Sequence, residues 1–275
     1  MGLYALTSFA GAPGVTTTAV AMATLSPRPT VLVEADMTGG SAVLAGRIAS
    51  RISHDRSVVW LGDHADDVAH FADHVWDQTV KLPGSDHAWL VPGISAPVQA
   101  RSVIGRWDGI GRGLAALSQS TGHDVISDLG RWTTVSAPHR LLDHLDALVV
   151  MTDPRLPTLN ATRQGLAHLG EEHGGAALTR TAVAVIERQW SWRKEDRAGW
   201  QSRPYRPREI RPLVKPCPVL TSLPFRPVDA AVYSDCGELT RWHDHSAYAR
   251  AVRSLLTDAQ DHATRAAETL GPRSP

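Results

Sequence analysis

The sequence predicts an α/β protein whose doubly wound, mostly parallel sheet is flanked by helices. Apolar runs of strand length alternate with helix-length segments from residue 3 to about residue 187. The first strand, helix and second strand also fit within residues 3–35, which is typical of a βαβ unit with parallel strands. With 275 residues and 43% hydrophobic composition, the chain is long and apolar enough to bury a sizeable core.

The first three elements set this pattern. Residues 3–6 are apolar and predict a strand, which ends at a turn rich in Gly and Pro. Residues 15–25 are rich in Ala and Met and predict a helix. The β-branched run at 30–35 predicts the second strand, and it closes on Asp36 before a pair of glycines.

The next elements follow the same alternation. We expect a short helix at 41–52, and the spacing of apolar residues predicts helical structure in the acidic, His-rich stretch 62–80. A short buried strand at 87–91 runs into Pro and Gly, and residues 101–117 predict another helix.

The alternation continues to residue 187. A strand at 123–129 is followed by a helix at about 137–144 and a very apolar strand at 147–151. A helix at about 158–169 and a strand at 182–186 complete this series, as in a doubly wound sheet.

Composition changes after this point. Residues 189–216 are rich in Arg, Trp and Pro and predict an irregular loop or insertion, because the prolines exclude a continuous helix or central strand. Strand character resumes at 219–223, and a final helix is expected at about 245–270. We therefore predict one domain, residues 1–270, with this insertion and a flexible tail at 271–275.

Charge and cysteine content narrow the function classes. The formal net charge is zero, so no global field attracts the chain to nucleic acid or anionic lipid. The two cysteines, Cys217 and Cys236, form neither a disulfide framework nor a metal-ligand spacing. No basic leader with a cleavage site and no run of about 18 apolar residues is present, so we expect a cytoplasmic protein without a transmembrane segment.

The turn between the first strand and the first helix suits a phosphate. Gly11 and Gly14 let the backbone approach an anion, and the unpaired N–H groups of the first helical turn point at it. The P-loop pattern G-x-x-x-x-G-K-[ST] requires a lysine just before the hydroxyl residue, and Val15 stands there. The turn therefore has the backbone groups that bind a phosphate but lacks the lysine of the P-loop pattern.

Five landmarks occur in an order that resembles the ParA/MinD family of deviant P-loop ATPases. The family opens on K-G-G-x-G-K-T-T and ends its second strand on D-x-D-P-Q-G. The matching segments here are 10–17, 33–39, the Walker B-like strand 124–128, 146–154 and 219–224. The G-x-P-G-V-T-T loop most resembles MinD-like proteins of actinobacteria, which are related to the CpaE/TadZ proteins that position pilus or secretion machinery.

This resemblance implies a P-loop fold that binds ATP or ADP with Mg²⁺. It implies cofactor-binding residues in the loop: Gly11, Ala12, Pro13, Gly14, Val15, Thr16 and Thr17. It also implies that Thr16, Asp36 and Asp128 face the metal, with Asp36 and Asp128 at the family's catalytic positions. The alternative is that the glycine turn has only a structural role and binds no nucleotide, and that the two aspartates cap neighbouring turns.

The sequence differs from the family pattern at three positions that bear on nucleotide binding and hydrolysis. Both family lysines are replaced, by Ala10 and Val15, and Glu187 stands where the family often has an Asn near the adenine. Removing transition-state cations of this kind costs on the order of 10³-fold or more in rate. We therefore expect a degenerate Walker A motif and little or no ATP hydrolysis.

The resulting functional hypothesis is a positioning or regulatory module for a larger assembly of the partitioning, pilus or secretion type. A protein partner is expected, and a homodimer stays open as a family expectation. One alternative is an active Mg-ATPase in which Arg131, Arg155 or a partner replaces the lysines. Another is a ParA-like non-specific DNA-binding protein that uses residues 189–216.

The insertion mixes cations with aromatic side chains, a combination that binds nucleic acid, membrane interfaces or proteins. The residues concerned are Trp190, Trp192, Arg193, Lys194, Arg197, Trp200, Arg203, Tyr205, Arg206, Arg208 and Arg211. We favour a cover for the sheet edge or a protein-partner surface, because interfaces also enrich Trp, Tyr and Arg.

The last helix and the His70/His74 pair are both interpreted as structural rather than as a membrane anchor or a metal site. The last helix lacks the bulky apolar face with a basic flank that a MinD-type membrane anchor requires. His70 and His74 have the i,i+4 spacing of helical metal ligands, but the acidic and polar surroundings favour a solvated helix.

Overall fold

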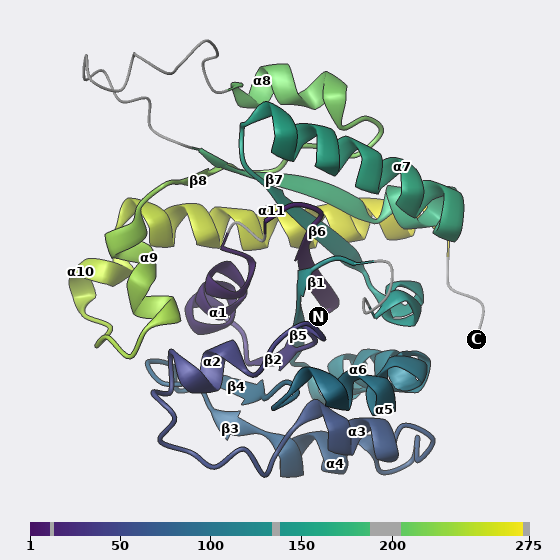
Figure 1. Ribbon diagram of the computed structural model, residues 1–275, viewed down its shortest axis with the longest axis vertical. Helices are drawn as coiled ribbons and strands as arrows, with labels where there is room; N and C mark the ends of the chain where they lie inside the picture. The colour runs from purple at the N-terminus through teal and green to yellow at the C-terminus, as the bar shows by residue number, and fades with distance from the viewer. Residues whose placement is uncertain (12–13, 134–137, 188–204, 272–275) are drawn as a thin grey trace.

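The computed structural model describes residues 1–11, 14–133, 138–187 and 205–271 (Figure 1). These residues form an eight-stranded sheet in the order β3-β4-β2-β5-β1-β6-β7-β8. The strands are β1 (Leu3–Ser8), β2 (Thr30–Glu34), β3 (Val80–Lys81), β4 (Ala88–Val91), β5 (Asp124–Arg131), β6 (Ala147–Thr152), β7 (Thr181–Glu187) and β8 (Leu223–Pro224). The paired strands are parallel except for β3 and β4, which are antiparallel. The predicted fold class is confirmed.

The strand register places the carboxyl ends of β1, β2, β5 and β6 at one edge of the sheet. β1 lies between β5 and β6, with Leu6 opposite Asp128 on one side and Val149 on the other. On the far side of β5, Glu34 of β2 pairs with the same Asp128. Because these strands are parallel, their carboxyl ends and the loops that follow them meet at one edge.

Helices cover both faces of the sheet, and alternate residues of each strand serve the two cores (Figure 1). In β1, Leu3 and Ala5 belong to one core, while Tyr4 and Leu6 belong to the other. The first core is covered by α3 (Val58–Asp63), α4 (Phe71–Gln78), α5 (Ala100–Val103), α6 (Trp107–Thr121), the 3₁₀ helix η3 (His139–His144), α7 (Leu156–Thr179) and α8 (Pro207–Ile210). The second core is covered by α1 (Val15–Leu25), α2 (Ala42–Ala45), α9 (Pro227–Ser234) and α11 (Ala247–Leu270). The remaining short helices are η1 (Pro97–Gln99), η2 (Ile104–Arg106), η5 (Arg211–Leu213) and α10 (Arg241–Asp244).

Two predicted helices are divided. The stretch 62–80 contains the end of α3, a turn and then α4, because the Asp67 carboxylate accepts hydrogen bonds from the His70 backbone and ring instead of continuing the helix. The helix expected at 101–117 consists of α5, the 3₁₀ turn η2 and α6. The helix expected at 41–52 is helical only in α2.

The expected strand at 219–223 is wrong over most of its length. Val219 forms an isolated bridge to Val183, and only Leu223 enters β8. Between them, Thr221 donates from its backbone N–H and its hydroxyl to Asp258 of α11, at 2.8 and 2.7 Å. A side chain of the last helix therefore takes the place of a ladder partner.

Other boundaries differ from the prediction for local reasons. The helix expected at 137–144 is the 3₁₀ helix η3, and residue 137 lies outside the described residues. α7 extends ten residues beyond the predicted end at 169, with a break at Gly174 (φ 75°). The last helix begins at Ala247 because the Ser246 hydroxyl accepts from the Ala249 N–H at 3.1 Å. Most of the predicted insertion, residues 189–204, lies outside the described residues, and its described end holds α8 and η5, each with Pro near its start.

Within the described parts of the chain, every helix is too short or too polar to cross a membrane.

Candidate functional site

The turn after β1 has the backbone of an anion-binding loop. Gly11 (φ 65°) and Gly14 (φ 63°) both adopt the left-handed conformation that favours glycine. Gly14 is the N-cap of α1, and no side chain caps this helix start. The first-turn N–H groups of α1 are therefore available to an anion. Ala12 and Pro13, also predicted to bind the cofactor, lie outside the described residues.

Val15 turns away from this loop into the protein. Its side chain is 1% exposed and belongs to the core between α1 and the sheet. Ala10, at the position of the other missing lysine, is half-buried, and its backbone N–H and carbonyl both bond to the Ser8 hydroxyl. Neither position places a cation beside the loop.

Asp128 is the buried carboxylate at the end of β5. Its Oδ1 accepts a hydrogen bond from the Gly130 N–H at 3.0 Å, and the Thr16 hydroxyl bonds to the same carboxyl group. Burial, with smaller contributions from the nearby Glu34 and Asp36, raises the pKa of Asp128 to about 7. The structure thus brings Thr16 and Asp128 into contact and leaves the Asp128 carboxyl partly protonated at neutral pH.

Asp36 lies over the same strand end. Its Oδ1 accepts from the Thr38 N–H at 2.8 Å and the Thr38 hydroxyl at 2.6 Å. A Cβ added to Gly130 (φ 56°) would lie 2.0 Å from Asp36 Oδ2, so only glycine there lets the carboxylate approach β5. The two aspartates that the sequence singled out are therefore neighbours, and their oxygens with the Thr16 hydroxyl are the hard donors that Mg²⁺ prefers.

Glu34 is a third carboxylate at this edge, and sequence reasoning assigned it no role. It is 4% exposed and accepts from the Val43 N–H at 2.9 Å, the Gly93 N–H at 3.1 Å and the Ser41 hydroxyl. Burial raises the pKa of Glu34. Its contacts tie the end of β2 to α2 and to the turn after β4, which makes it an anchor for the site. A charged residue ending an otherwise apolar strand was the available signal.

A cavity of about 180 Å³ adjoins the loop. Its lining comes from the loop and α1, from the ends of β6, β7 and β8, and from α9 and α11: Gly14, Thr17, Thr18, Asp153, Ile186, Pro224, Phe225, Arg226, Pro227, Ala230 and Tyr248. The Tyr248 hydroxyl lies 3.3 Å from Thr18 Oγ1, and burial raises the pKa of Tyr248 to about 12. The last helix therefore closes one wall of the cavity.

The arginines proposed to replace the missing lysines are placed differently. Arg155 is bound to buried Asp153, with 2.6 Å between Nη2 and Oδ2. Burial raises the pKa of Asp153, but hydrogen bonds from Arg155 outweigh it and the net shift is downward. Arg131 is an exposed residue at the end of β5. Arg226, which the sequence analysis did not single out, lines the cavity beside Gly14, and the Phe-Arg-Pro turn after β8 was its only signal.

Glu187 and the His70/His74 pair, which the sequence analysis also considered, do not line this cavity. Glu187 is exposed at the end of β7, where its carbonyl accepts from the Phe225 N–H at 2.9 Å. His70 and His74 each bond to Asp67, at 3.1 Å in both cases, and His70 is largely exposed.

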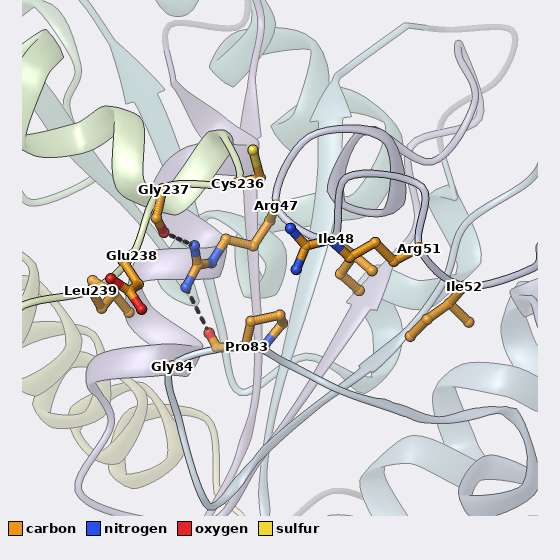
Figure 2. A pocket seen from close by; sticks show the side chains of 10 residues that line it. All are labelled: Arg47, Ile48, Arg51, Ile52, Pro83, Gly84, Cys236, Gly237, Glu238 and Leu239. Carbon is orange, nitrogen blue, oxygen red and sulfur yellow. Dashed lines mark hydrogen bonds between the residues drawn. The ribbon is translucent and has the colours of Figure 1, made fainter.

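A second cavity, of about 370 Å³, shares no lining residue with the first (Figure 2). Buried Arg47 crosses it, donating to the carbonyls of Gly237 and of Pro83, the latter at 2.9 Å. These contacts join the turn after α2 to the β3–β4 hairpin and to the segment between α9 and α10. We therefore assign Arg47 a structural role.

Comparisons with known proteins place the fold. No protein-family model matches the sequence, and no curated protein matches it. A ParA family ATPase from Chlorobium tepidum is similar in structure, with a TM-score of 0.67 and 13% identity over 93% of this chain and 98% of that one. The septum site-determining protein MinD of Pyrococcus horikoshii, complexed with Mg-ADP, gives a TM-score of 0.68 and 14% identity over 97% and 99%. MinD in the MinC:MinD complex of Aquifex aeolicus gives a TM-score of 0.63 and 15% identity over 100% of this chain and 98% of that one. At these identities the chain shares the fold of ParA/MinD ATPases over almost its whole length.

Proposed function

We propose that this chain is a ParA/MinD-like nucleotide-binding protein with little or no ATP hydrolysis, acting as a positioning or regulatory module of a larger assembly. The observation that carries the proposal is the combination of an uncapped α1 N-terminus with a buried Val15. The loop offers uncapped helix N–H groups, while the lysine position contributes to the core instead.

The binding half of the proposal rests on the site's donors. The α1 N-terminus suits phosphates, and Thr16, Asp36 and Asp128 suit Mg²⁺. Bound Mg²⁺ would supply the positive charge that lets two carboxylates coexist with a polyphosphate. Mg-ADP in the similar Pyrococcus MinD supports a nucleotide of this kind.

The low-turnover half rests on the missing cations. Phosphoryl transfer is catalysed mainly by positioning and by positive charge on the transferring group. Val15 is buried and Arg155 is held by Asp153, so neither supplies that charge. An assembly role is supported by the similar Aquifex MinD, which forms a complex with MinC.

Calorimetry of the full chain with Mg-ATP and with Mg-ADP tests this function. We expect saturable binding of one nucleotide per chain, weakened by Asp128→Asn because this variant removes a carboxylate that faces the metal. Asp66→Asn, which changes an exposed carboxylate in the turn before α4, is the control and leaves binding unchanged. If neither nucleotide gives a binding heat, the proposal is contradicted and the loop has only a structural role.

A working Mg-ATPase stays an alternative because Arg226 lines the cavity beside Gly14. If Arg226 serves as the replacement cation, Arg226→Ala abolishes turnover that the wild-type chain displays. If the proposal holds, wild type and Arg226→Ala are equally inactive.

A further inference from the structure

Three potential metal ligands converge where η3 meets the C-terminal part of α7. His139 is the first residue of η3, while Glu172 and His173 lie just before the break in α7 at Gly174. Their ligand atoms all lie within 4.8 Å of one another. None of these residues lines the cavity beside the phosphate-type loop.

The distances within this cluster suit a small transition-metal ion. His139 Nδ1 lies 3.3 Å from His173 Nε2 and 3.8 Å from Glu172 Oε2, and the last two atoms are 3.9 Å apart. The centre of such a triangle is about 2.1 Å from each corner, which matches Zn–N and Zn–O bond lengths. Two imidazoles and a carboxylate form a donor set that Zn²⁺ accepts, with one position left for water.

The surroundings hold these side chains in place. His168 Nε2 lies 3.2 Å from Glu172 Oε1, the other oxygen of the same carboxylate. The Trp132 and His139 rings pack in a T-shaped arrangement, with ring centroids 4.8 Å apart. The side chains of His139 and His173 are only 24% and 15% exposed.

The short distance between the two histidine rings also has a second explanation. The His139 and His173 rings are within 13° of parallel, so a hydrogen bond between the two rings is the competing explanation for the short distance.

We propose that His139, Glu172 and His173 bind a divalent transition-metal ion of the Zn²⁺ class, which joins η3 to α7. Such a site is separate from the proposed nucleotide site and does not depend on nucleotide binding.

The test is calorimetric titration of untagged, metal-free protein with ZnCl₂, supported by the visible absorption of the Co²⁺ form. We expect one Zn²⁺ per chain and Co²⁺ bands typical of four-coordinate geometry. Glu172→Gln and His173→Gln should each weaken Zn²⁺ binding at least about 10-fold, because each removes a ligand. Glu172 is partly exposed on a helix, so its variant tests the site even if a histidine variant misfolds.

His70→Asn is the matched control, because His70 is also a helix-associated histidine beside a carboxylate. It should bind Zn²⁺ as the wild type does. The proposal is overturned if wild-type protein binds no Zn²⁺, which leaves a hydrogen-bonded histidine pair, or if binding survives Glu172→Gln and His173→Gln. Loss of binding in His70→Asn alone would also overturn it by moving the site to the turn before α4.

Discussion

At the scale of single residues, the candidate site is defined by charges that the protein retains and charges that it lacks. Asp36 and Asp128 meet at the ends of β2 and β5, and Thr16 bonds to Asp128. The position that would balance them with a lysine is the buried Val15. Burial, more than the neighbouring Glu34 and Asp36, raises the pKa of Asp128.

The raised pKa makes Asp128 a source of pH-dependent instability without Mg²⁺. Between the unfolded pKa of about 4 and the folded value of about 7, the native state binds more protons than the unfolded state. Wild-type stability should therefore fall as pH rises through this window, and Asp128→Asn should remove that fall. Urea unfolding should show the variant gaining on the order of 1–3 kcal/mol relative to wild type between pH 5 and pH 8.

Asp66→Asn is the control for this measurement, since Asp66 is 90% exposed on its side chain. Its stability relative to wild type should not change over the same pH range. A pH-independent difference between Asp128→Asn and wild type would contradict the burial of a titrating carboxyl group at this position.

Restoring the missing charge should strengthen nucleotide binding. In Val15→Lys, the long stem lets the ammonium leave the core and reach the loop, at some cost in stability. We expect Mg-ATP to bind about 10-fold more tightly, through charge-assisted contacts with phosphate. Val15→Met controls for side-chain size, and equal affinities of the two folded variants would show that the missing cation does not limit binding.

Sequence reasoning at this scale proposed residues whose place a motif fixes and did not propose those whose place tertiary contacts define. Thr16, Asp36 and Asp128 follow from the order of motifs along the chain. Glu34 owes its role to partners at Ser41, Val43 and Gly93, which no local pattern connects to it. Arg226 lines the cavity because it lies in the turn between β8 and α9, and the local sequence does not reveal that placement.

At the scale of elements, strands were predicted well where both faces are buried. β6 is an almost continuous apolar run, and every residue of β5 except Arg131 is buried, because helices cover both sides of the sheet. Short edge elements were not predicted: β3 has only two residues, and α9 and α10 begin within turn-rich sequence. Among these elements α9 packs against α1, and the Arg47 contacts tie the β3–β4 hairpin to the segment between α9 and α10.

Arg47 offers a direct test of this element-level packing. Arg47→Ala removes a buried charged donor that bonds to the carbonyls of Pro83 and Gly237, and a hydrogen bond that involves a charged group contributes about 1.5–3 kcal/mol. We expect a loss of about 2–4 kcal/mol in the free energy of unfolding, measured with urea. Arg51→Ala, at the neighbouring exposed arginine of the same cavity, should stay within about 0.5 kcal/mol of wild type. Similar effects of the two substitutions would contradict the structural role of Arg47.

At the scale of the whole molecule, the fold gathers distant parts of the chain around one edge of the sheet. The loop after β1, the ends of β2 and β5, the turn after β8 and the last helix all contribute to the candidate site or to its cavity. Shared fold with ParA/MinD ATPases accounts for this arrangement. The fold does not determine the charge of the site, and the proposed low turnover depends on that charge.

The decisive measurement is phosphate release by the full chain at saturating Mg-ATP, with wild type and Asp128→Ala measured side by side. We expect wild type to bind nucleotide yet to release phosphate no faster than Asp128→Ala. Turnover above background that disappears in Asp128→Ala would contradict the proposed low turnover, because a cation from elsewhere would then be completing the site.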